Sequence, residues 1–460
     1  MNYYFLGIGG IGMSAIARYY KSQGFYVAGY DRVRGLICEE LEGEGFDVHY
    51  EDNLSLIPSS CLDPALTMVV YTPAIPEDSK EFYFFKNTGF KMYKRSQVLG
   101  EITRNERGLC VAGTHGKTTT STILAHLLYQ SSIECNAFLG GISNNYETNL
   151  LLSPNSNFVV IEADEFDRSF HYLHPYMAIV TSVDPDHLDV YGDAEGYRKG
   201  FEYFTSLIQP GGALVMKKGI LLTPCLQKGV KLFTYSANEK ADFYADNIRI
   251  SEGEILFDFV APTETVHDLK LGVPVLINIE NSVAALAVAW LNGITHNEMR
   301  TALSSYAGIY RRFNVLVKNE HVVLIDDYAH HPAELRASIE SVRKLYPNRK
   351  LTGVFQPHLY SRTRDFADGF AESLSLLDEL IMLPIYPARE RPIEGVSSSL
   401  IFDKVVCPHK QLVSKDQLLQ VLSHRDGEVI LTLGAGDIDA LVPKVAEMLK
   451  NEYLSIKKAQ

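Results

Sequence analysis

Along the first hundred residues, short apolar runs alternate with segments in which apolar residues recur every three or four positions. Runs such as YYFL, YVAGYD and MVVYTPAI predict buried strands, and segments such as SAIARYYKSQG and ICEELEGEG predict helices. Strands that alternate with helices in this way are typical of a parallel sheet with crossover helices. The pattern therefore predicts an α/β, Rossmann-like domain over residues 1–103, which ends at the polar break TRNERG.

The same alternation restarts twice further along the chain. The strand LCVAG and a long helix from about Lys117 begin a second domain, predicted over residues 104–311, which also contains the strands FVVIEAD and MAIVTSVD. After YAGIYRRFN, the runs HVVLIDDYAHHP, KLTGVFQPH and EVILTLGAGD predict a third domain over residues 312–460, again doubly wound and Rossmann-like. A chain of 460 residues has room for three domains at about 150 residues each.

Composition and charge narrow the choice of partners and compartment. The formal net charge of -13 argues against nucleic acid, because a phosphate backbone is bound by a basic surface. The most apolar long stretch, residues 273–294, contains Asn278, Glu280 and Asn281 and predicts a buried helix rather than a membrane span. The six cysteines are scattered singly, as expected of reduced thiols. We therefore expect a cytoplasmic protein without a membrane or nucleic-acid partner.

The first candidate site is the glycine-rich stretch LGIGGIG, which follows a predicted strand and opens a predicted helix. Gly7, Gly9 and Gly12 match G-x-G-x-x-G, and Asp31 ends the next strand, as in dinucleotide-binding folds. Backbone amides at such a turn can bind a diphosphate, and the acid can accept hydrogen bonds from ribose hydroxyls. The motif alone favours NAD, but it specifies only a diphosphate and a ribose.

The second candidate site is VAGTHGKTTT, which lies between a predicted strand and a predicted helix. It departs from the usual P-loop G-x-x-x-x-G-K-[ST], because Val111 stands where the first glycine would be. Gly116, Lys117 and Thr118 keep the groups that bind β- and γ-phosphates and ligate magnesium. A chance Gly-Lys-Thr at the start of a helix is the alternative. The stretch predicts a P-loop ATPase-like central domain.

Acidic residues cluster where two strands of the central domain end. Glu162, Asp164 and Glu165 follow the strand FVVIEAD, and His187 lies in DPDHLD after the next strand. Carboxylates beside a phosphate loop are suited to hard cations that offset the charge of a nucleotide. A solvated acidic rim is the alternative interpretation.

Taken in order, the motifs GTHGKTTT, EADEFDRSF, TSVDPDHLDVYG, YRRF, DDYAHHP and FQPHLYSRT resemble those of the Mur ligases of peptidoglycan synthesis. The resemblance runs from Gly7 to the late LGAGDI. It implies an ATP-dependent ligase whose first domain binds UDP-N-acetylmuramate, whose central domain binds ATP and Mg²⁺, and whose third domain binds an amino acid, here L-alanine. The two glycine-rich loops would then serve two phosphorylated ligands. The implied oligomeric state is a monomer or a weak homodimer.

The resemblance also implies roles for individual residues. The UDP-sugar site would comprise Gly7, Gly9, Gly10, Ile11, Gly12, Asp31, Thr72 and Ala74. The ATP site would comprise Gly113, Thr114, His115, Gly116, Lys117, Thr118, Thr119, Asn278, Asn281, Arg312 and Asp327. The metal ligands would be Thr118, Glu165 and His187, and the amino-acid site would comprise Tyr328, His330, His358 and Arg362. The implied catalytic residues are Lys117, Glu165, His187, His330 and Arg362.

Three positions depart from patterns in the family. Ile277 stands where a histidine usually precedes the two asparagines, and Leu359 stands where an arginine is frequent. Phe201 matches the position at which ligases that add later residues carry a carbamylated lysine, which favours the alanine-adding member. Helix capping is an alternative role for Asn278.

Three other functions stay open on the sequence alone. They are a recycling ligase that attaches a tripeptide to the same sugar nucleotide, an NAD-dependent oxidoreductase, and a non-catalytic nucleotide-sensing module. The oxidoreductase would leave Lys117, Glu165 and the whole third domain without a role.

Overall fold

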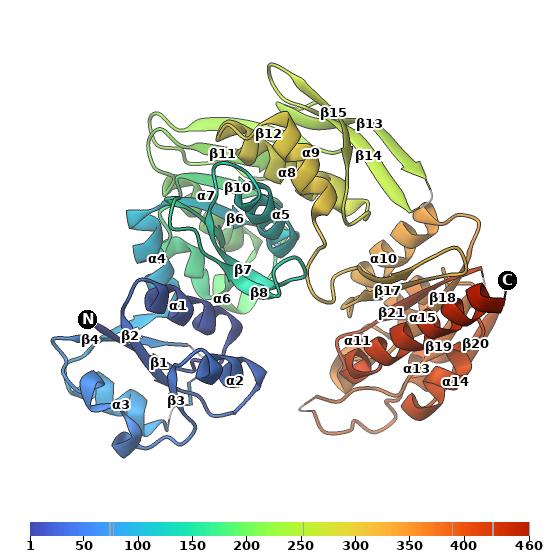
Figure 1. Cartoon of the computed structure of the whole chain (residues 1–460), viewed down its shortest axis with the longest axis horizontal. Coiled ribbons are helices and arrows are strands. Elements are labelled where there is room, and N and C mark those ends of the chain that lie inside the picture. Colours follow the sequence, from blue (N-terminus) through green and yellow to red (C-terminus); the bar gives the residue numbers. More distant parts are fainter. Residues whose placement is uncertain (73–74, 77, 252, 389, 426, 460) are drawn as a thin grey trace. The chain divides into compact units, whose positions relative to one another are not determined.

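The computed structural model describes residues 1–459 except 73, 74, 77, 252, 389 and 426 (Figure 1). Its contacts divide the chain into two compact units. The first unit comprises Met1–Asp246, Asp258–Leu269 and Glu280–Tyr306, and the second comprises Asn247–Phe257, Lys270–Ile279 and Ala307–Gln460. Each unit is described by itself below.

The first sheet has five parallel strands in the order β3-β2-β1-β4-β5. The strands are β1 (Asn2–Leu6), β2 (Tyr26–Tyr30), β3 (Asp47–His49), β4 (Thr67–Tyr71) and β5 (Lys91–Lys94). The helices are α1 (Ile11–Ser22), α2 (Leu36–Gly43), α3 (Lys80–Asn87) and α4 (Arg95–Asn105). The strand order reverses between β1 and β4, so the glycine loop after β1 lies at the switch point where such folds bind ligands.

The central sheet has ten strands in the order β15-β14-β13-β12-β11-β10-β6-β9-β7-β8. The strands are β6 (Arg107–Ala112), β7 (Asn136–Ser143), β8 (Thr148–Leu151), β9 (Phe158–Glu162), β10 (Met177–Val180), β11 (Ala213–Lys217), β12 (Lys231–Ser236), β13 (Phe243–Ser251), β14 (Glu254–Val260) and β15 (Thr265–Lys270). The helices are α5 (Lys117–Tyr129), α6 (Leu188–Tyr191), α7 (Ala194–Ser206), α8 (Ile277–Leu291) and α9 (His296–Ser305). Strand β6 runs parallel to β9 and β10, its two neighbours, so the loops after all three strands share one edge of the sheet.

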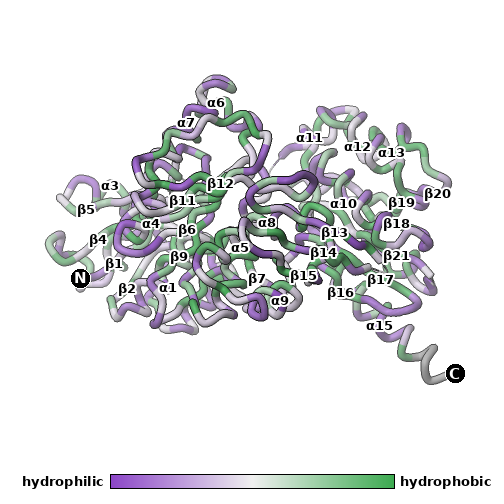
Figure 2. Tube along the Cα trace, turned by 90° about the horizontal axis from the view of Figure 1, so that it is seen from above, coloured by the Kyte–Doolittle hydropathy of each residue, from purple (hydrophilic) through white to green (hydrophobic). Residues whose placement is uncertain are grey.

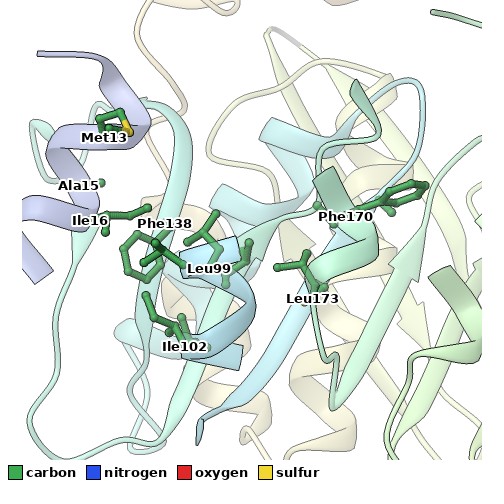
Figure 3. Packing of buried hydrophobic residues seen from close by; sticks show 14 of the residues in the cluster. Met13, Ala15, Ile16, Leu99, Ile102, Phe138, Phe170 and Leu173 are labelled. Atoms are coloured by element: carbon green, nitrogen blue, oxygen red, sulfur yellow. The ribbon is translucent and has the colours of Figure 1, made fainter. Parts of the chain in front are cut away.

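The first sheet and the central sheet are joined through α1, α4 and β7. Phe138 of β7 lies beside Ile16 of α1 and Leu99 of α4 (Figure 3), and its ring is 5.5 Å from that of Tyr19. The side chain of Asn149 donates a hydrogen bond to the carbonyl of Ile11 at 2.5 Å. The end of the first glycine loop is therefore fixed to the central sheet by direct contacts.

The third sheet has six strands in the order β16-β17-β21-β18-β19-β20, and all pairs except β16 with β17 are parallel. The strands are β16 (Asn314–Lys318), β17 (Val322–Asp327), β18 (Lys350–Phe355), β19 (Glu379–Met382), β20 (His409–Leu412) and β21 (Glu428–Leu433). The helices are α10 (Pro332–Leu345), α11 (Tyr360–Asp365), α12 (Ala367–Leu374), α13 (Ser399–Phe402), α14 (Leu418–Leu422) and α15 (Val442–Ala459).

These sheets confirm the predicted α/β class with doubly wound outer domains. The chain is hydrophobic along interior strands such as β6 and β9, and it is hydrophilic in many of the surrounding loops (Figure 2). The exact limits 1–103, 104–311 and 312–460 stay predictions; α4 ends at Asn105 and the third sheet begins at Asn314. Among the helices of the described residues, none combines the length and the apolar character needed to cross a membrane.

A buried polar network connects β1, β3 and α3 of the first sheet and its helices. The Tyr4 hydroxyl donates to Glu81 Oε2 at 2.6 Å and lies 2.7 Å from His49 Nε2, and the Asn53 amide donates to Glu81 Oε1 at 3.2 Å. Glu81 is fully buried. Burial raises the pKa of Glu81 to about 7, although both hydrogen bonds oppose that shift.

This network predicts a pH dependence of stability. Because the native state holds the Glu81 proton between about pH 4.5 and pH 7 and the unfolded chain does not, stability should fall as the pH rises through this window. Glu81→Gln has no carboxyl group at this position, so its stability should not fall for this reason. The free energy of unfolding of the variant minus that of wild type should therefore increase from pH 4.5 to pH 7, by at most about 3 kcal/mol. Urea unfolding at a series of pH values measures the difference, with the exposed Glu51→Gln as the control. A difference that does not change with pH would contradict the assignment.

Candidate active site

The second glycine-rich loop connects β6 to α5 and depends on two glycines. Gly113 has φ +138° and Gly116 has φ +81°, a region that favours glycine. A Cβ atom on Gly113 would overlap the Thr181 hydroxyl, and one on Gly116 would lie 2.8 Å from Asn281 Oδ1. Both the backbone conformation and the available space therefore require glycine at these positions.

Residues that follow β10 hold this loop in place. The Thr181 hydroxyl donates to the His115 carbonyl at 2.5 Å, and the His115 amide donates to Ser182 Oγ at 2.9 Å. Sequence reasoning missed both partners, although TSVD directly after an apolar strand is a signal that could have indicated them.

Residues of α7 and α8 make two further contacts, one with the loop and one with the first turns of α5. The Thr114 hydroxyl donates to the Asp184 carbonyl at 2.7 Å, so it accepts its second hydrogen bond, at 2.9 Å, from the buried hydroxyl of Tyr197 on α7. The Thr120 hydroxyl donates to Asn281 Oδ1 of α8 at 3.2 Å. No local pattern in the sequence indicates that Tyr197 contacts the loop.

Lys117, the first residue of α5, lies at the mouth of the loop. Its Nζ atom is 2.7 Å from the Gly113 carbonyl oxygen and 2.9 and 2.7 Å from the two carboxylate oxygens of Glu165. Burial raises the pKa of Glu165, and the neighbouring ammonium opposes that shift. The ammonium thus lies where a P-loop lysine contacts β- and γ-phosphate oxygens.

The oxygen ligands predicted for magnesium are paired differently from the prediction. Thr118 Oγ1 donates to Glu162 Oε1 at 3.1 Å, whereas Glu165 contacts Lys117. A Cβ atom on Gly140 would overlap the Glu162 carboxylate, so glycine there leaves room for that side chain. A hydroxyl and two carboxylates are hard oxygen donors that suit Mg²⁺. Among the described residues, no group of three or more His, Cys, Asp and Glu side chains is placed to hold a metal ion.

His187 lies directly before α6 and has a left-handed backbone conformation, with φ +50°. Its Nε2 atom is 3.7 Å from Asp186 Oδ2, and its ring meets that of Phe166 edge-on at 5.1 Å. Within the part of the chain that the structure describes, no hydrogen bond or ion pair joins His187 to Glu165 or Thr118. Its role as a metal ligand stays a prediction.

The first glycine-rich loop is organised partly by Asp31. Asp31 Oδ2 accepts from the Gly9 amide at 2.8 Å and Oδ1 accepts from the Val33 amide at 3.1 Å. A Cβ atom on Gly7, at φ +87°, would lie 2.7 Å from Thr72 Cγ2. The ribose contact of Asp31 stays a prediction, and Ala74 lies outside the described residues.

A cavity of about 220 Å³ connects the end of this first loop with the carboxylates of the central sheet. Ile11, Gly12 and Arg95 line one side. Glu162 and Asp164, which follow or end β9, line another. The cavity therefore lies between the first glycine loop and carboxylates beside the P-loop, within one compact unit, and Glu162 at its edge accepts a hydrogen bond from Thr118.

The two predicted adenine contacts are buried in the fold. Near the start of α8, the side-chain amide of Asn278 donates a hydrogen bond to the Val273 carbonyl at 3.2 Å. Asn281 lies one turn further along and accepts from Thr120. Their contact with adenine stays a prediction.

In the third domain, the four residues predicted for the amino-acid site lie together at the ends of β17 and β18. His330 Nδ1 is 3.0 Å from the Tyr328 carbonyl oxygen, and the rings of His330 and His358 are 6.4 Å apart. Arg362 Nη1 is 3.5 Å from His358 Nδ1. Burial, and secondarily the Arg362 charge, lowers the pKa of His358. Burial also lowers the pKa of His330, and in both rings this shift favours the neutral form.

The arginine pair before β16 divides into a buried and an exposed member. Arg311, which sequence reasoning missed, donates to the Gly434 carbonyl at 2.6 Å and pairs with Asp326 at 3.5 Å. Arg312 is exposed, as the predicted γ-phosphate contact requires. Asp327 accepts a hydrogen bond from the Ser338 hydroxyl, and burial raises the pKa of Asp327 to about 6.

Comparisons with known proteins match three successive parts of the chain to one family. The sequence matches the Mur ligase family catalytic domain over residues 2–107, the Mur ligase middle domain over residues 111–289, and the Mur ligase glutamate ligase domain over residues 311–436. The chain is 61% identical over 446 residues to the UDP-N-acetylmuramate–L-alanine ligase of Parabacteroides distasonis, covering 97% of this chain and 96% of the relative.

Solved structures give the same relationship. The fold matches the UDP-N-acetylmuramate-alanine ligase of Thermotoga maritima with a TM-score of 0.80 and 26% identity, over 98% of this chain and 100% of that one. A murein peptide ligase from Psychrobacter arcticus shares the fold with a TM-score of 0.61 and 22% identity, over 98% and 99% of the two chains. The three domain matches span most of the sequence, and the chain therefore belongs to the Mur ligase family.

Proposed function

We propose that the chain joins L-alanine to the lactyl carboxylate of UDP-N-acetylmuramate while ATP is converted to ADP and phosphate. This reaction belongs to cytoplasmic peptidoglycan precursor synthesis, and we propose that the protein works as a monomer or a weak homodimer. The observation that carries the proposal is the cavity in which the first glycine loop meets the carboxylates beside the P-loop. The names of the full-length relatives support the choice of substrates.

The chemistry explains why both loops are needed. A carboxylate is a poor acyl donor until one oxygen becomes a good leaving group, so the γ-phosphoryl group of ATP is first transferred to the lactyl carboxylate. The amine then attacks the acyl phosphate, and the tetrahedral intermediate expels phosphate. The protein positions the reactants and stabilises charge in this reaction.

The residues of the central loop suit the first step. Lys117, held between Gly113 and Glu165, can exchange those contacts for oxygens of the transferring phosphoryl group. Thr118, Glu162 and Glu165 would hold Mg²⁺, which neutralises phosphate charge when bound. The hydrogen bond from Tyr197 to Thr114 keeps the loop in its binding conformation.

The cluster in the third domain suits the second step. The Arg362 guanidinium can bind both carboxylate oxygens of alanine. The incoming amine must lose its proton before it attacks, and a neutral histidine such as His330 or His358 can accept it.

The substrate requirement is the direct test. Phosphate release should need ATP, Mg²⁺, UDP-N-acetylmuramate and L-alanine together, measured with the full chain and with each component omitted in turn. The tripeptide of the recycling reaction should support little release. Turnover with that tripeptide in preference to L-alanine would reassign the chain to the recycling reaction, and hydride transfer from a nicotinamide would overturn the ligase proposal.

Arg362→Ala tests the amino-acid site. Without the guanidinium that binds both of its carboxylate oxygens, alanine should be badly positioned. A displacement of the reacting amine by about 1 Å can lower the rate about 100-fold. We expect a decrease of that order in kcat/KM for alanine, with ATP affinity near wild type by titration. Arg364→Ala is a matched control on the same helix, because Arg364 is exposed and pairs with Asp365. Unchanged alanine kinetics together with lost ATP binding would place Arg362 at phosphate instead.

A further inference from the structure

Arg95 is the first residue of α4 and lines the cavity between the first glycine loop and the carboxylates of the central sheet. A Cβ atom on Gly12 would lie 2.7 Å from Arg95 Nη1 and 3.1 Å from its Cδ, so the guanidinium packs directly against the backbone of the first loop. Glycine at position 12 therefore leaves the space in which the arginine reaches the cavity.

The guanidinium has no partner in the part of the chain that the structure describes. No hydrogen bond, ion pair or ring contact involves the Arg95 side chain, although it is half-buried. Its neighbour Lys94 pairs with Asp167 at 3.1 Å, and Arg104, at the other end of α4, pairs with Glu101 at 3.1 Å. Arg95 also lies at the positive end of its helix, where a cation is unfavourable. A charge kept unpaired in such a place indicates an anion that comes from outside the chain.

The walls of the cavity restrict where that anion binds. Glu162 and Asp164 line another side of the cavity and would repel an anion. An anion is therefore stabilised on the Arg95 side, next to the first glycine loop, and a cation on the carboxylate side. A guanidinium fork matches two oxygens of a phosphate or a carboxylate.

We propose that Arg95 binds an oxyanion of the sugar nucleotide and so orients this substrate toward the carboxylates beside the P-loop. The oxyanion belongs either to the diphosphate or to the lactyl carboxylate, which share this chemistry. The assignment rests on the proposed function for the identity of the nucleotide, and no sequence motif considered above includes Arg95.

Binding titrations of the full chain test this assignment. Wild type, Arg95→Ala and Arg95→Lys are titrated with UDP-N-acetylmuramate, UDP-N-acetylglucosamine and UDP, and separately with ATP. Arg95→Ala should weaken binding of the muramate nucleotide by about 10- to 100-fold, the usual effect of losing a charge-assisted hydrogen-bond pair. The affinity of Arg95→Lys for the muramate nucleotide should lie between those of wild type and Arg95→Ala, because lysine keeps the charge but cannot bind two oxygens as the planar guanidinium does. Arg104→Gln, which removes a paired and exposed charge from the same helix, is the control and should bind like wild type.

The three ligands separate the possible sources of the oxyanion. An equal loss for all three places the diphosphate at Arg95, whereas a loss confined to the muramate nucleotide places the lactyl carboxylate there. Wild-type affinity of Arg95→Ala for all three ligands would overturn the proposal, and so would an equal loss of ATP affinity, which would indicate a general defect of folding. If the wild-type protein binds the sugar nucleotides but releases no phosphate in the ligase assay with all substrates, the ligase function would be overturned but not the role of Arg95. Failure of wild type to bind any of the three would overturn both.

Discussion

The contact between Lys117 and Glu165 is the interaction on which the central site depends. A buried carboxylate is tolerated because an ammonium lies less than 3 Å from it, and that ammonium is held over the loop by the Gly113 carbonyl. The pair holds the ammonium at the position where a phosphate is expected, and hydrogen bonds with Thr181, Ser182 and Tyr197 fix the loop around it.

The connection between the first and central sheets gives this site a second wall. Phe138 packs between α1 and α4, so the glycine loop that precedes α1 cannot shift without disturbing a buried aromatic cluster (Figure 3). This packing gives the cavity between the first glycine loop and the carboxylates of the central sheet a defined lining. Membership of the Mur ligase family, whose members are ligases, also decides against the oxidoreductase interpretation that the first glycine motif had suggested.

The periodicity of apolar residues was sufficient to predict the sheets, because buried parallel strands and their crossover helices leave strong patterns in a sequence. The site was predictable where a backbone requirement fixes the residue, as at Gly116, and where chemistry fixes it, as at Lys117. Other contacts depend on side-chain directions that only the folded chain determines: Thr118 bonds to Glu162 rather than meeting Glu165. Arg95 and Tyr197 lie in ordinary helices, and their importance comes from what faces them across the fold.

The aromatic surroundings of Phe201 determine whether a metal ligand could form at this position by reaction with carbon dioxide. Phe201 is fully buried, and its ring lies 5.1 Å from that of Phe170 and 5.2 Å from that of Tyr197. The family resemblance implies that ligases adding later residues carry a carbamylated lysine at the matching position, and such a group forms only when dissolved CO₂ adds reversibly to an amine. A phenyl ring has no nitrogen for that addition, and the tight aromatic packing leaves no room for one. The proposed metal site of Thr118, Glu162 and Glu165 would therefore not depend on the bicarbonate concentration around the protein.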